Sequence, residues 1–423
     1  MLIFNKGASH LSITERQLKE YIFNILDSVG KRSRVLIIPP DFTRFHSAAG
    51  IITQYIYDYY RSDLKAILPA LGTHFPMTEA EIQKMFGNIP QELFVKHDWR
   101  KDVITLGEVP ASYVHEVSEG RVNYSWPAQV NKLLVEGNFD LILSIGQVVP
   151  HEVIGMANYN KNVFVGTGGA EGINKSHFLG AAFGLERIMG RADTPVRKVL
   201  DYASENFAAD LPIIYIQTVI SKNEKGHLTM RGLYAGDDRE CFDLAANLSL
   251  KVNFQLLDRE LEKIVVYLNP EEFKSTWLGN KSIYRTRMAI ANDGELIILA
   301  PGLREFGEDR EIDRLIRKYG YRTTPEILAA VDENEDLSNN LSAAAHLIHG
   351  STEGRFSVTY CPGHISREEI EGVNYTYAPL AEMLLKYDPE KLVDGMNELP
   401  DGERVFYISN PALGLWSWKN NFK

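Results

Sequence analysis

The strand-like apolar run FDLILSI, residues 139–145, and the polar stretch after it constrain the fold of this chain most strongly. Residues 148–180, VVPHEVIGMANYNKNVFVGTGGAEGINKSHFLG, carry His151, Lys161 and His177 among glycines, asparagines and small residues, where a packed core would place leucine and valine. These three residues are spaced too widely for one helix face or one strand to bring them together. A folded loop on a rigid α/β scaffold could do so. Taken singly, each has a plainer interpretation as a solvated surface residue.

Strand, loop and helix alternate in the N-terminal part of the chain. The elements expected before the FDLILSI run are a helix over 14–29, a strand over 34–38, a helix over 48–61 and a strand over 64–68. The loops DFTRFHS and GTHFPMT follow the two strands, and Thr78 with Glu81 predicts a capping box at the next helix. Ligands collect at the carboxyl ends of strands in open α/β sheets, which is where all three polar loops fall.

A second alternating series predicts a second domain. The later elements expected are a helix from Pro195, a strand over 212–219, a helix over 243–257, strands over 294–300 and 356–361, and helices over 311–319 and 325–331. A chain of 423 residues with 44% hydrophobic content can form two or three cores. We therefore predict two α/β domains with mostly parallel sheets and a cleft between them. The N-terminal domain is expected over 1–258 and the C-terminal domain over 259–408, with a last segment over 409–423 that could return to the N-terminal domain.

Charge and cysteine content argue against several classes of protein. The formal net charge of −11 argues against a nucleic-acid-binding protein, because such proteins need clustered lysine and arginine. Residues 1–15 have neither a basic region nor a sustained apolar region of a signal peptide, and no stretch approaches the length of a membrane span. Cys241 and Cys361 cannot form a disulfide framework or a thiolate zinc site, so a reducing cytoplasm is expected. The oligomeric state is not indicated.

Other residues that could carry chemistry also stand at strand ends. Asp41 and Arg44 are spaced for an ion pair that stabilises the turn, or for Asp41 to orient Arg44 toward a carboxylate or phosphate. His74 lies in a rigid turn flanked by glycine and proline. Lys281 opens the first helix of the second domain, either as an exposed helix-start lysine or as a charge that closes a cleft.

These residues leave two classes of function open. The glycine-rich stretch VGTGGAEG, residues 165–172, could cradle a phosphate, but it is neither a GxGxxG fingerprint nor a P-loop. The chain has no GxSxG, HExxH or CxxC motif. One class is an enzyme that performs acid/base or metal chemistry with histidine. The other is a protein that binds a phosphate or carboxylate in its cleft.

The motifs of this chain resemble those of the nickel-dependent lactate racemase superfamily, whose members racemise or epimerise 2-hydroxy acids. DFTR resembles the family's DxTR motif, and GTHFPMTEAEI is close to its GTHxPMT motif. PHEVIGMANYNK followed by NKSH keeps His, Lys and His at the family's offsets. Lys281 stands where the family has a lysine soon after the domain boundary. The resemblance covers nearly the whole chain.

The resemblance implies a cofactor and the residues that hold it. Lys161 would attach the nickel-pincer nucleotide, a pyridinium-3,5-bisthiocarboxylic acid mononucleotide whose ring carbon and two sulfurs hold nickel. His177 would be the protein's nickel ligand. Arg44 and Lys281 would hold the carboxylate of the substrate, and Asp41 would support Arg44 or another residue of the site, His74.

The same resemblance implies the reaction. His74 and His151 would be the paired acid/base residues, because inverting a carbon that bears OH and H needs one group on each face and histidine titrates near neutrality. Loss of the hydroxyl proton with hydride transfer to the cofactor would give a 2-keto acid, to which hydride then returns.

The departures from the family concern the substrate. NYNK replaces a GGRK-type sequence before the lysine of the lactate racemases, and Trp277 and Leu278 replace their tyrosine and glutamine. DLSNNLSAAAHLIHG stands where they carry an active-site tryptophan. Its polar residues are Asn339, Asn340, His346 and His349, which could bond a longer polyhydroxy substrate, although surface or core positions are the commoner explanation.

We therefore expect a 2-hydroxyacid racemase or epimerase that acts on a sugar acid, as a gluconate/mannonate 2-epimerase would. The first alternative is a racemase of lactate or of another short or dicarboxylic 2-hydroxy acid. The second is a non-catalytic protein that binds a nucleotide or a carboxylate.

Overall fold

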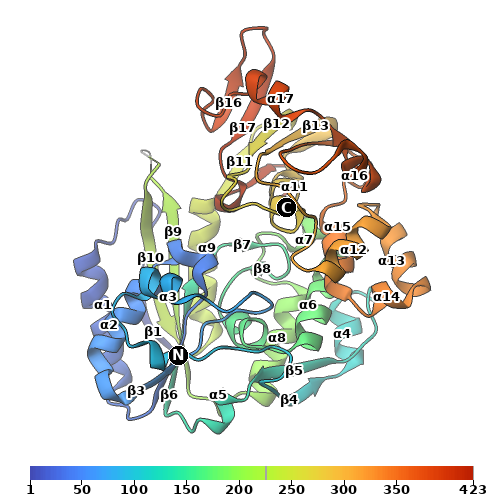
Figure 1. Cartoon of the computed structure of the whole chain (residues 1–423). Coiled ribbons are helices and arrows are strands. Elements are labelled where there is room, and N and C mark those ends of the chain that lie inside the picture. Colours follow the sequence, from blue (N-terminus) through green and yellow to red (C-terminus); the bar gives the residue numbers. More distant parts are fainter. Residues whose placement is uncertain (224–225, 423) are drawn as a thin grey trace. The chain divides into compact units, whose positions relative to one another are not determined.

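The computed structural model of the chain describes residues 1–223 and 226–422 and forms two compact α/β units (Figure 1). Unit 1 comprises Met1–Leu179 and Ile188–Asn253, and unit 2 comprises Gly180–Arg187 and Phe254–Lys423. The predicted α/β class with mostly parallel sheets is confirmed. The division falls just before the expected boundary at residue 258, and the short segment 180–187 groups with unit 2.

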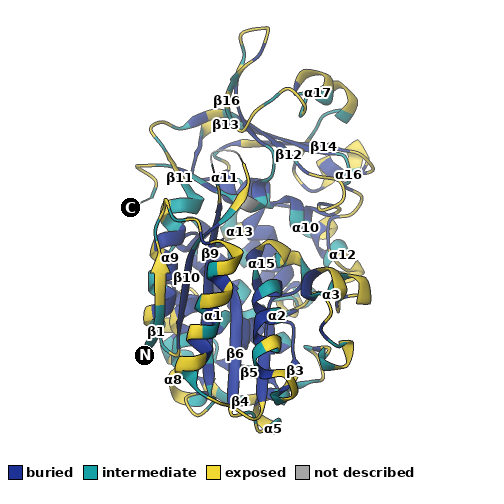
Figure 2. Ribbon diagram, turned by 90° about the vertical axis from the view of Figure 1, so that its left-hand side faces the viewer, coloured by how far each residue is buried: buried dark blue, intermediate teal, exposed yellow. Residues whose placement is uncertain are grey.

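Unit 1 is built on a six-stranded sheet with the order β1-β10-β9-β6-β2-β3. The strands β3, β2, β6 and β9 are parallel neighbours, whereas β10 and β1 are antiparallel additions at one edge. Their bounds are β1 Leu2–Gly7, β2 Val35–Ile38, β3 Leu64–Ile67, β6 Leu141–Gln147, β9 Ile213–Lys222 and β10 Leu228–Gly236. The run FDLILSI thus supplies the central strand, which is buried along nearly its whole length (Figure 2).

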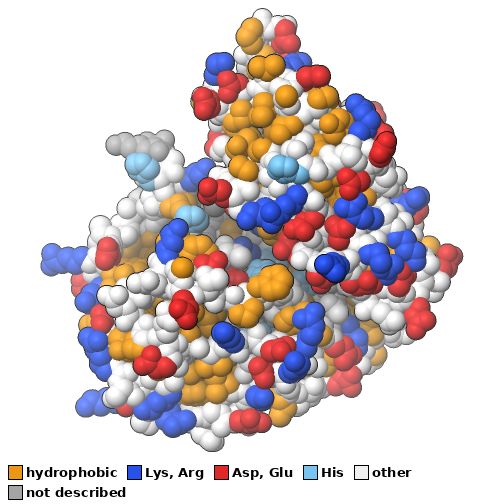
Figure 3. Space-filling model, viewed as in Figure 1, with side chains coloured by type: hydrophobic (Ala, Val, Ile, Leu, Met, Phe, Trp, Pro, Cys, Tyr) orange, Lys and Arg blue, Asp and Glu red, His pale blue; other side chains and the backbone are white. Residues whose placement is uncertain are grey.

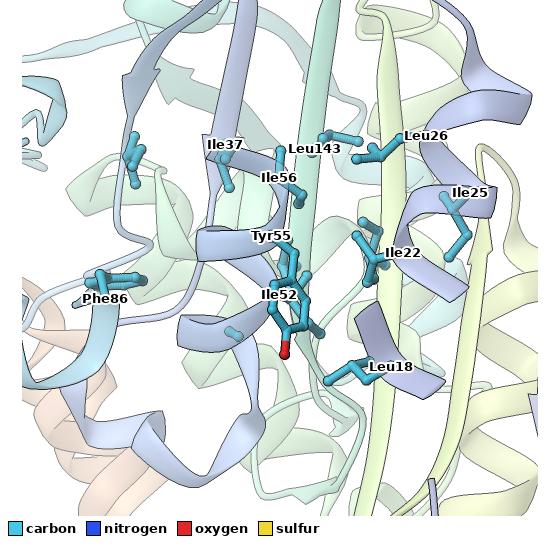
Figure 4. Close-up of a cluster of buried hydrophobic side chains, with 14 of the residues drawn as sticks. Leu18, Ile22, Ile25, Leu26, Ile37, Ile52, Tyr55, Ile56, Phe86 and Leu143 are labelled. Atoms are coloured by element: carbon cyan, nitrogen blue, oxygen red, sulfur yellow. The ribbon is translucent and has the colours of Figure 1, made fainter. Parts of the chain in front are cut away.

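Two helices cover one face of this sheet. Helix α1, Glu15–Val29, starts at a capping box formed by Thr14, and its Leu18, Ile22, Ile25 and Leu26 are buried. They pack with helix α2, Ala49–Tyr60, and with strand residues such as Ile37 and Leu143 (Figure 4). Each such side chain contributes about 1.5–3 kcal/mol by leaving water, so this layer is a rigid support for the loops at the strand ends.

The remaining elements of unit 1 lie in the long connections. Thr78 and Glu81 form the predicted capping box at α3, Glu79–Phe86. The other bounds are β4 Val103–Val109, α4 Ala111–Val117, β5 Trp126–Asn131, α5 Leu133–Glu136, β7 Pro150–His151, β8 Gly155–Met156, α6 Ala170–Phe183, α7 Leu185–Ile188, α8 Pro195–Phe207 and α9 Arg239–Asn253. Helices α6 and α7 contain the residues that group with unit 2.

Unit 2 contains a second six-stranded sheet, with the order β15-β14-β13-β12-β17-β16. All neighbours in it are parallel except β16 and β17. The bounds of its strands are β12 Leu261–Tyr267, β13 Ile290–Ala300, β14 Ser357–Pro362, β15 Thr376–Tyr377, β16 Gly395–Glu398 and β17 Arg404–Ile408. Its helices are α10 Thr276–Gly279, α11 Lys281–Thr286, α12 Arg310–Tyr319, α13 Thr324–Glu333, α14 Glu335–Ser338, α15 Leu341–His349, α16 Arg367–Gly372 and α17 Leu380–Lys386.

The end of the chain differs from the sequence-based expectation. Residues 254–257, expected to continue a helix, form strand β11, Phe254–Leu257, which pairs in parallel with β18, Leu415–Trp418. The described residues of the last segment, 409–422, group with unit 2. The pairing partner lies far away in the sequence, which is why local pattern alone predicted a longer helix.

The surface in view in Figure 3 carries acidic and basic side chains side by side within each unit. In the described residues no helix is both long enough and apolar enough to cross a membrane.

Candidate active site

The predicted site residues of unit 1 follow three adjacent parallel strands. Asp41 follows β2, His74 follows β3, and His151 follows β6, and these strands lie in the order β3-β2-β6. The carboxyl ends of parallel strands meet at one edge of a sheet, so the three loops converge there. Lys281 belongs to unit 2, where it begins α11.

Asp41 and His74 form a hydrogen-bonded pair. Asp41 Oδ2 lies 2.6 Å from His74 Nδ1, and Asp41 Oδ1 accepts from Thr43 N at 3.1 Å and Thr43 Oγ1 at 2.5 Å. Burial favours the neutral acid, but His74, Thr43 and the charge of Arg44 together bring the pKa of Asp41 below its ordinary value. Asp41 is thus a carboxylate that can only accept, so Nδ1 of His74 carries the proton and Nε2 keeps a lone pair.

Arg44 faces the same group of residues from the 3₁₀ segment Phe42–Ser47. Its positive charge lowers the pKa of His151 and of Lys161 as well as that of Asp41. The end of the segment is fixed to β9, because Thr218 Oγ1 donates to the carbonyl of Ser47 at 2.8 Å. The carboxylate of Asp41 is engaged by His74 and by Thr43, so the predicted ion pair between Asp41 and Arg44 is not among the contacts of this turn within the described residues.

His151 has the opposite arrangement of its ring nitrogens. It lies in the short hairpin of β7 and β8, is 7% exposed, and its Nδ1 accepts from the backbone N–H of Val153 at 3.1 Å. The neutral ring must then carry its proton on Nε2. Burial, reinforced by the charges of Lys161, Arg44 and His177 against the opposing effect of Glu152, lowers the pKa of His151 well below its ordinary value.

Lys161 precedes the one-turn π-helix Asn162–Gly166. Burial and the charge of Arg44 lower the pKa of its amine to about 8, which makes a neutral, nucleophilic amine accessible near neutral pH. The turn is tied to the loop of His74, since Gly72 N donates to Gly166 O at 2.8 Å. A Cβ at Gly166 would lie 2.6 Å from Ala70 Cβ, so only glycine permits this close approach.

His177 lies on α6, and its Nδ1 donates to the carbonyl of Ile173 at 2.7 Å. That bond fixes the tautomer and leaves Nε2 as the basic nitrogen, the arrangement found for metal-binding histidines. Burial is the main cause that lowers the pKa of His177 to about 4, with the charge of Lys161 adding to it and the bond to Ile173 opposing it.

Six of the seven predicted residues lie close enough together, on the three loops and α6, for their charges to affect one another's pKa. Within residues 1–223 and 226–422, no cluster of three or more His, Cys, Asp or Glu side chains could hold a metal ion.

Unit 2 holds Lys281 beside an aromatic and polar cluster. Lys281 is partly buried, with Nζ 5.7 Å from the centre of the Phe273 ring, and Trp277 one turn earlier is also partly buried. Trp277 stacks on His346 with ring centres 4.5 Å apart, and His346 Nε2 lies 2.9 Å from Tyr321 Oη.

The other polar residues suggested for the substrate have structural places in unit 2. Asn340 is the N-cap of α15, and its Oδ1 accepts from Ala343 N at 3.2 Å. His346 and His349 are both buried within that helix, and Asn339 is exposed. Asn340 Oδ1 and His346 Nε2 are thus engaged within unit 2, which agrees with the structural explanation of these two residues.

A cavity of about 770 Å³ lies in unit 1. Leu141, Ile213 and Tyr215 line it at the amino ends of β6 and β9, and Tyr159 and Val163, on either side of Lys161, line it as well. None of the six predicted residues is among its lining residues.

Comparison with known proteins identifies a related family. Residues 8–184 match the lactate racemase N-terminal domain, the part of the chain that carries the six residues described above. This part of the chain resembles the lactate racemase superfamily. No curated protein matches the sequence of the chain significantly.

Solved structures agree with this likeness. A crystal structure of a Thermotoga maritima protein resembles this chain with a TM-score of 0.82 and 26% identity, covering 98% of this chain and 100% of that chain. The lactate racemase apoprotein from Thermoanaerobacterium thermosaccharolyticum resembles it with a TM-score of 0.68 and 16% identity, covering 91% of this chain and 87% of that one. The second likeness concerns the fold. The match over residues 8–184 supports an isomerase of the racemase type.

Proposed function

We propose that the chain is a racemase or epimerase that inverts C2 of a 2-hydroxy acid, with a nickel-pincer nucleotide as cofactor and a sugar acid as substrate. The observation that carries the proposal is the complementary protonation of Nε2 in two histidines. His74 keeps a lone pair on Nε2, whereas His151 carries a proton there. A reaction that removes a proton on one side and delivers one on the other needs this combination.

The two histidines exchange roles in the reverse direction. Asp41 stabilises the positive charge that His74 acquires when it takes the hydroxyl proton, because the carboxylate accepts from Nδ1. His151 exchanges its proton at Nε2, because Nδ1 already accepts from the backbone N–H of Val153. We propose Arg44 and Lys281 as the partners of the substrate carboxylate, since both side chains carry a positive charge that can pair with it.

Lys161 and His177 fit the cofactor by their chemistry. The amine of Lys161, whose pKa is lowered to about 8, suits covalent attachment, and Nε2 of His177 suits a metal whose other ligands come from outside the protein. When bound, the cofactor would supply an acceptor for the hydride that leaves C2 of the substrate. The protein contributes the proton transfers and the orientation of the substrate.

The choice of a sugar acid rests on unit 2. Trp277 and Leu278 replace the tyrosine and glutamine of the lactate racemases, and both are partly buried one turn before Lys281. The ring of Trp277, which is partly buried and is backed by His346, offers an aromatic surface that suits the C–H face of a polyhydroxy chain better than a methyl group. Free thiols at Cys241 and Cys361, both buried, are in keeping with a cytoplasmic enzyme.

Mass spectrometry of protein loaded with cofactor tests the proposal. The holo-protein should carry a covalent adduct on Lys161 with nickel in proportion, and Lys161→Ala should lose the adduct. His177→Ala should keep the adduct and retain nickel poorly, because one ligand is gone. An adduct that persists in Lys161→Ala would overturn the assignment. Holo-protein that binds a 2-hydroxy acid without changing its stereochemistry would indicate a binding protein.

A further inference from the structure

The backbone just before Lys161 adopts an unusual conformation. Asn158 and Tyr159 have φ angles of 67° and 60°, in the left-handed region that glycine enters readily. Two consecutive non-glycine residues there are uncommon, and for a bulky residue such as Tyr159 the conformation is an outlier. Such a backbone persists only when the surrounding structure holds it.

Arg197 of α8 provides that support. Its side chain is fully buried, and its guanidinium donates to Asn160 Oδ1, to Met156 O at 2.8 Å and to Asn158 O at 3.3 Å. The guanidinium also lies 4.3 Å from the centre of the Phe242 ring and 5.7 Å from that of Tyr159. All the polar contacts of this charge that the structure provides are thus directed at the residues that lead to Lys161.

One turn further along α8, a second group completes the support. Asp201 Oδ1 accepts from Asn160 Nδ2 at 2.7 Å, while Asp201 Oδ2 accepts from Arg239 Nη1 at 2.5 Å. Both ends of the Asn160 amide are therefore held by α8. The other end of the turn is fixed independently, since Asn162 Nδ2 donates to Ile145 O at 3.0 Å.

Burial makes this arrangement costly. Desolvation lowers the pKa of Arg197 to about 10, and its Nε finds no acceptor in the described part of the chain. Well-packed apolar side chains usually give equal or greater stability than a buried charge. Arg197 is fully buried and its guanidinium forms hydrogen bonds with one short segment. Its presence is therefore better explained by a role in positioning that segment than by a contribution to the stability of the fold.

We propose that Arg197 is a positioning residue that holds residues 156–160 so that the amine of Lys161 is presented to the cofactor. The inference rests on the proposed function for the role of Lys161, but the contact between Arg197 and the loop does not. Sequence analysis missed Arg197, because nothing in the pattern around Pro195 distinguishes it from a surface arginine of an amphipathic helix.

The test combines hydrogen exchange of the apo-protein with the yield of the covalent adduct. In Arg197→Met, amide exchange in peptides covering 156–163 should rise roughly tenfold or more while peptides from β6 and β9 stay unchanged, because carbonyls of the loop lose their donors. The adduct yield should fall by a similar factor. Arg197→Lys, which keeps the charge with fewer donors, should lie between wild type and Arg197→Met in both measurements.

Arg231→Met is the matched control. Arg231 also joins separate segments of unit 1, donating to Leu11 O and to Ser221 Oγ at 3.0 Å each, but it does not touch the loop. In Arg231→Met, amide hydrogen exchange at 156–163 and the yield of the covalent adduct should stay within about twofold of wild type. If Arg197→Met does not fold, Arg197→Lys decides by the same two measurements.

The outcomes separate the two proposals. A normal adduct yield in Arg197→Met, whatever its loop exchange, would overturn the positioning role and leave the proposed function intact. A wild-type protein that forms no adduct would overturn the proposed function. In that case faster exchange at 156–163 in Arg197→Met would still support Arg197 as the support of this loop, and unchanged exchange would overturn it.

Discussion

The three site histidines of unit 1, His74, His151 and His177, and His346 of helix α15 in unit 2 look alike in the sequence but are used differently. His74 and His177 donate from Nδ1 to Asp41 Oδ2 and Ile173 O, and His151 accepts at Nδ1 from Val153 N. In each case the protein fixes one nitrogen, and within the described residues the structure gives Nε2 no hydrogen bond. In α15, Nε2 of His346 is engaged by Tyr321 and the ring stacks on Trp277.

The difference shows that a histidine marks a site through its second nitrogen. A ring with one nitrogen fixed and the other turned to the site has a defined tautomer and can exchange a proton or bind a metal. A ring whose Nε2 already pairs with a buried hydroxyl stabilises the core around it instead. The following predictions test this contrast, from the largest expected effect to the smallest.

The largest effect is expected at the proposed acid/base pair. His74→Ala and His151→Ala should each lower turnover by about 10²-fold or more in both directions, because each reaction uses both groups. His346→Ala should change turnover by less than about tenfold and lower the free energy of unfolding by roughly 1–2 kcal/mol, since Tyr321 loses a partner. Steady-state kinetics and urea unfolding measure these effects. Near-normal turnover in either alanine variant of the pair would refute the contrast.

A smaller loss is expected for Asp41→Asn, which alters a proton position and keeps the shape. Thr43 donates twice to Oδ1, so the amide oxygen should remain there and the NH₂ group should face His74 Nδ1. His74 would then move its proton to Nε2 and lose its function as a base, which should cost about 10- to 100-fold in turnover. Nitrogen chemical shifts of His74 report the tautomer directly. An unchanged tautomer with full activity would show that Asp41 does not set the state of His74.

The choice of substrate tests the role of unit 2. A six-carbon aldonate should be epimerised at C2 with kcat/KM at least roughly tenfold above that for lactate, which corresponds to about 1.4 kcal/mol. The reason is that a longer substrate which packs against the ring of Trp277, one turn before Lys281, gains contacts that lactate cannot make. A stereochemical assay at C2 with both acids measures the ratio. Equal values, or turnover of lactate alone, would exclude the sugar-acid proposal while leaving the acid/base pair untouched.

The smallest effect is expected at Asn340. Asn340→Ala removes the N-cap of α15 and should lower the free energy of unfolding by about 1 kcal/mol. Its kcat/KM for an aldonate should stay within about twofold of wild type, because the side-chain oxygen caps the helix. Asn340→Asp restores the cap and is the matched control. A large loss of kcat/KM with unchanged stability would instead return Asn340 to the binding of substrate.

The sequence alone determined the features that depend on neighbouring residues. The apolar run at 139–145 specified the central strand, and Thr78 with Glu81 specified a capping box, because both depend on residues within one turn or one strand. The polar loops after the strands indicated which residues converge, since parallel strands place their carboxyl ends at one edge. This argument located Asp41, His74 and His151 without any coordinates.

Tertiary structure decided what depends on distant partners. Strand β11 exists because β18 pairs with it from the far end of the chain, and local pattern favoured a longer helix there. The proton on His74 is set by Asp41, whereas that on His151 is set by a backbone N–H, so two identical side chains acquire opposite states. Arg197 supports the loop before Lys161 only because α8 folds over it. Burial and hydrogen-bond geometry are properties of the folded chain, so composition and spacing cannot specify them.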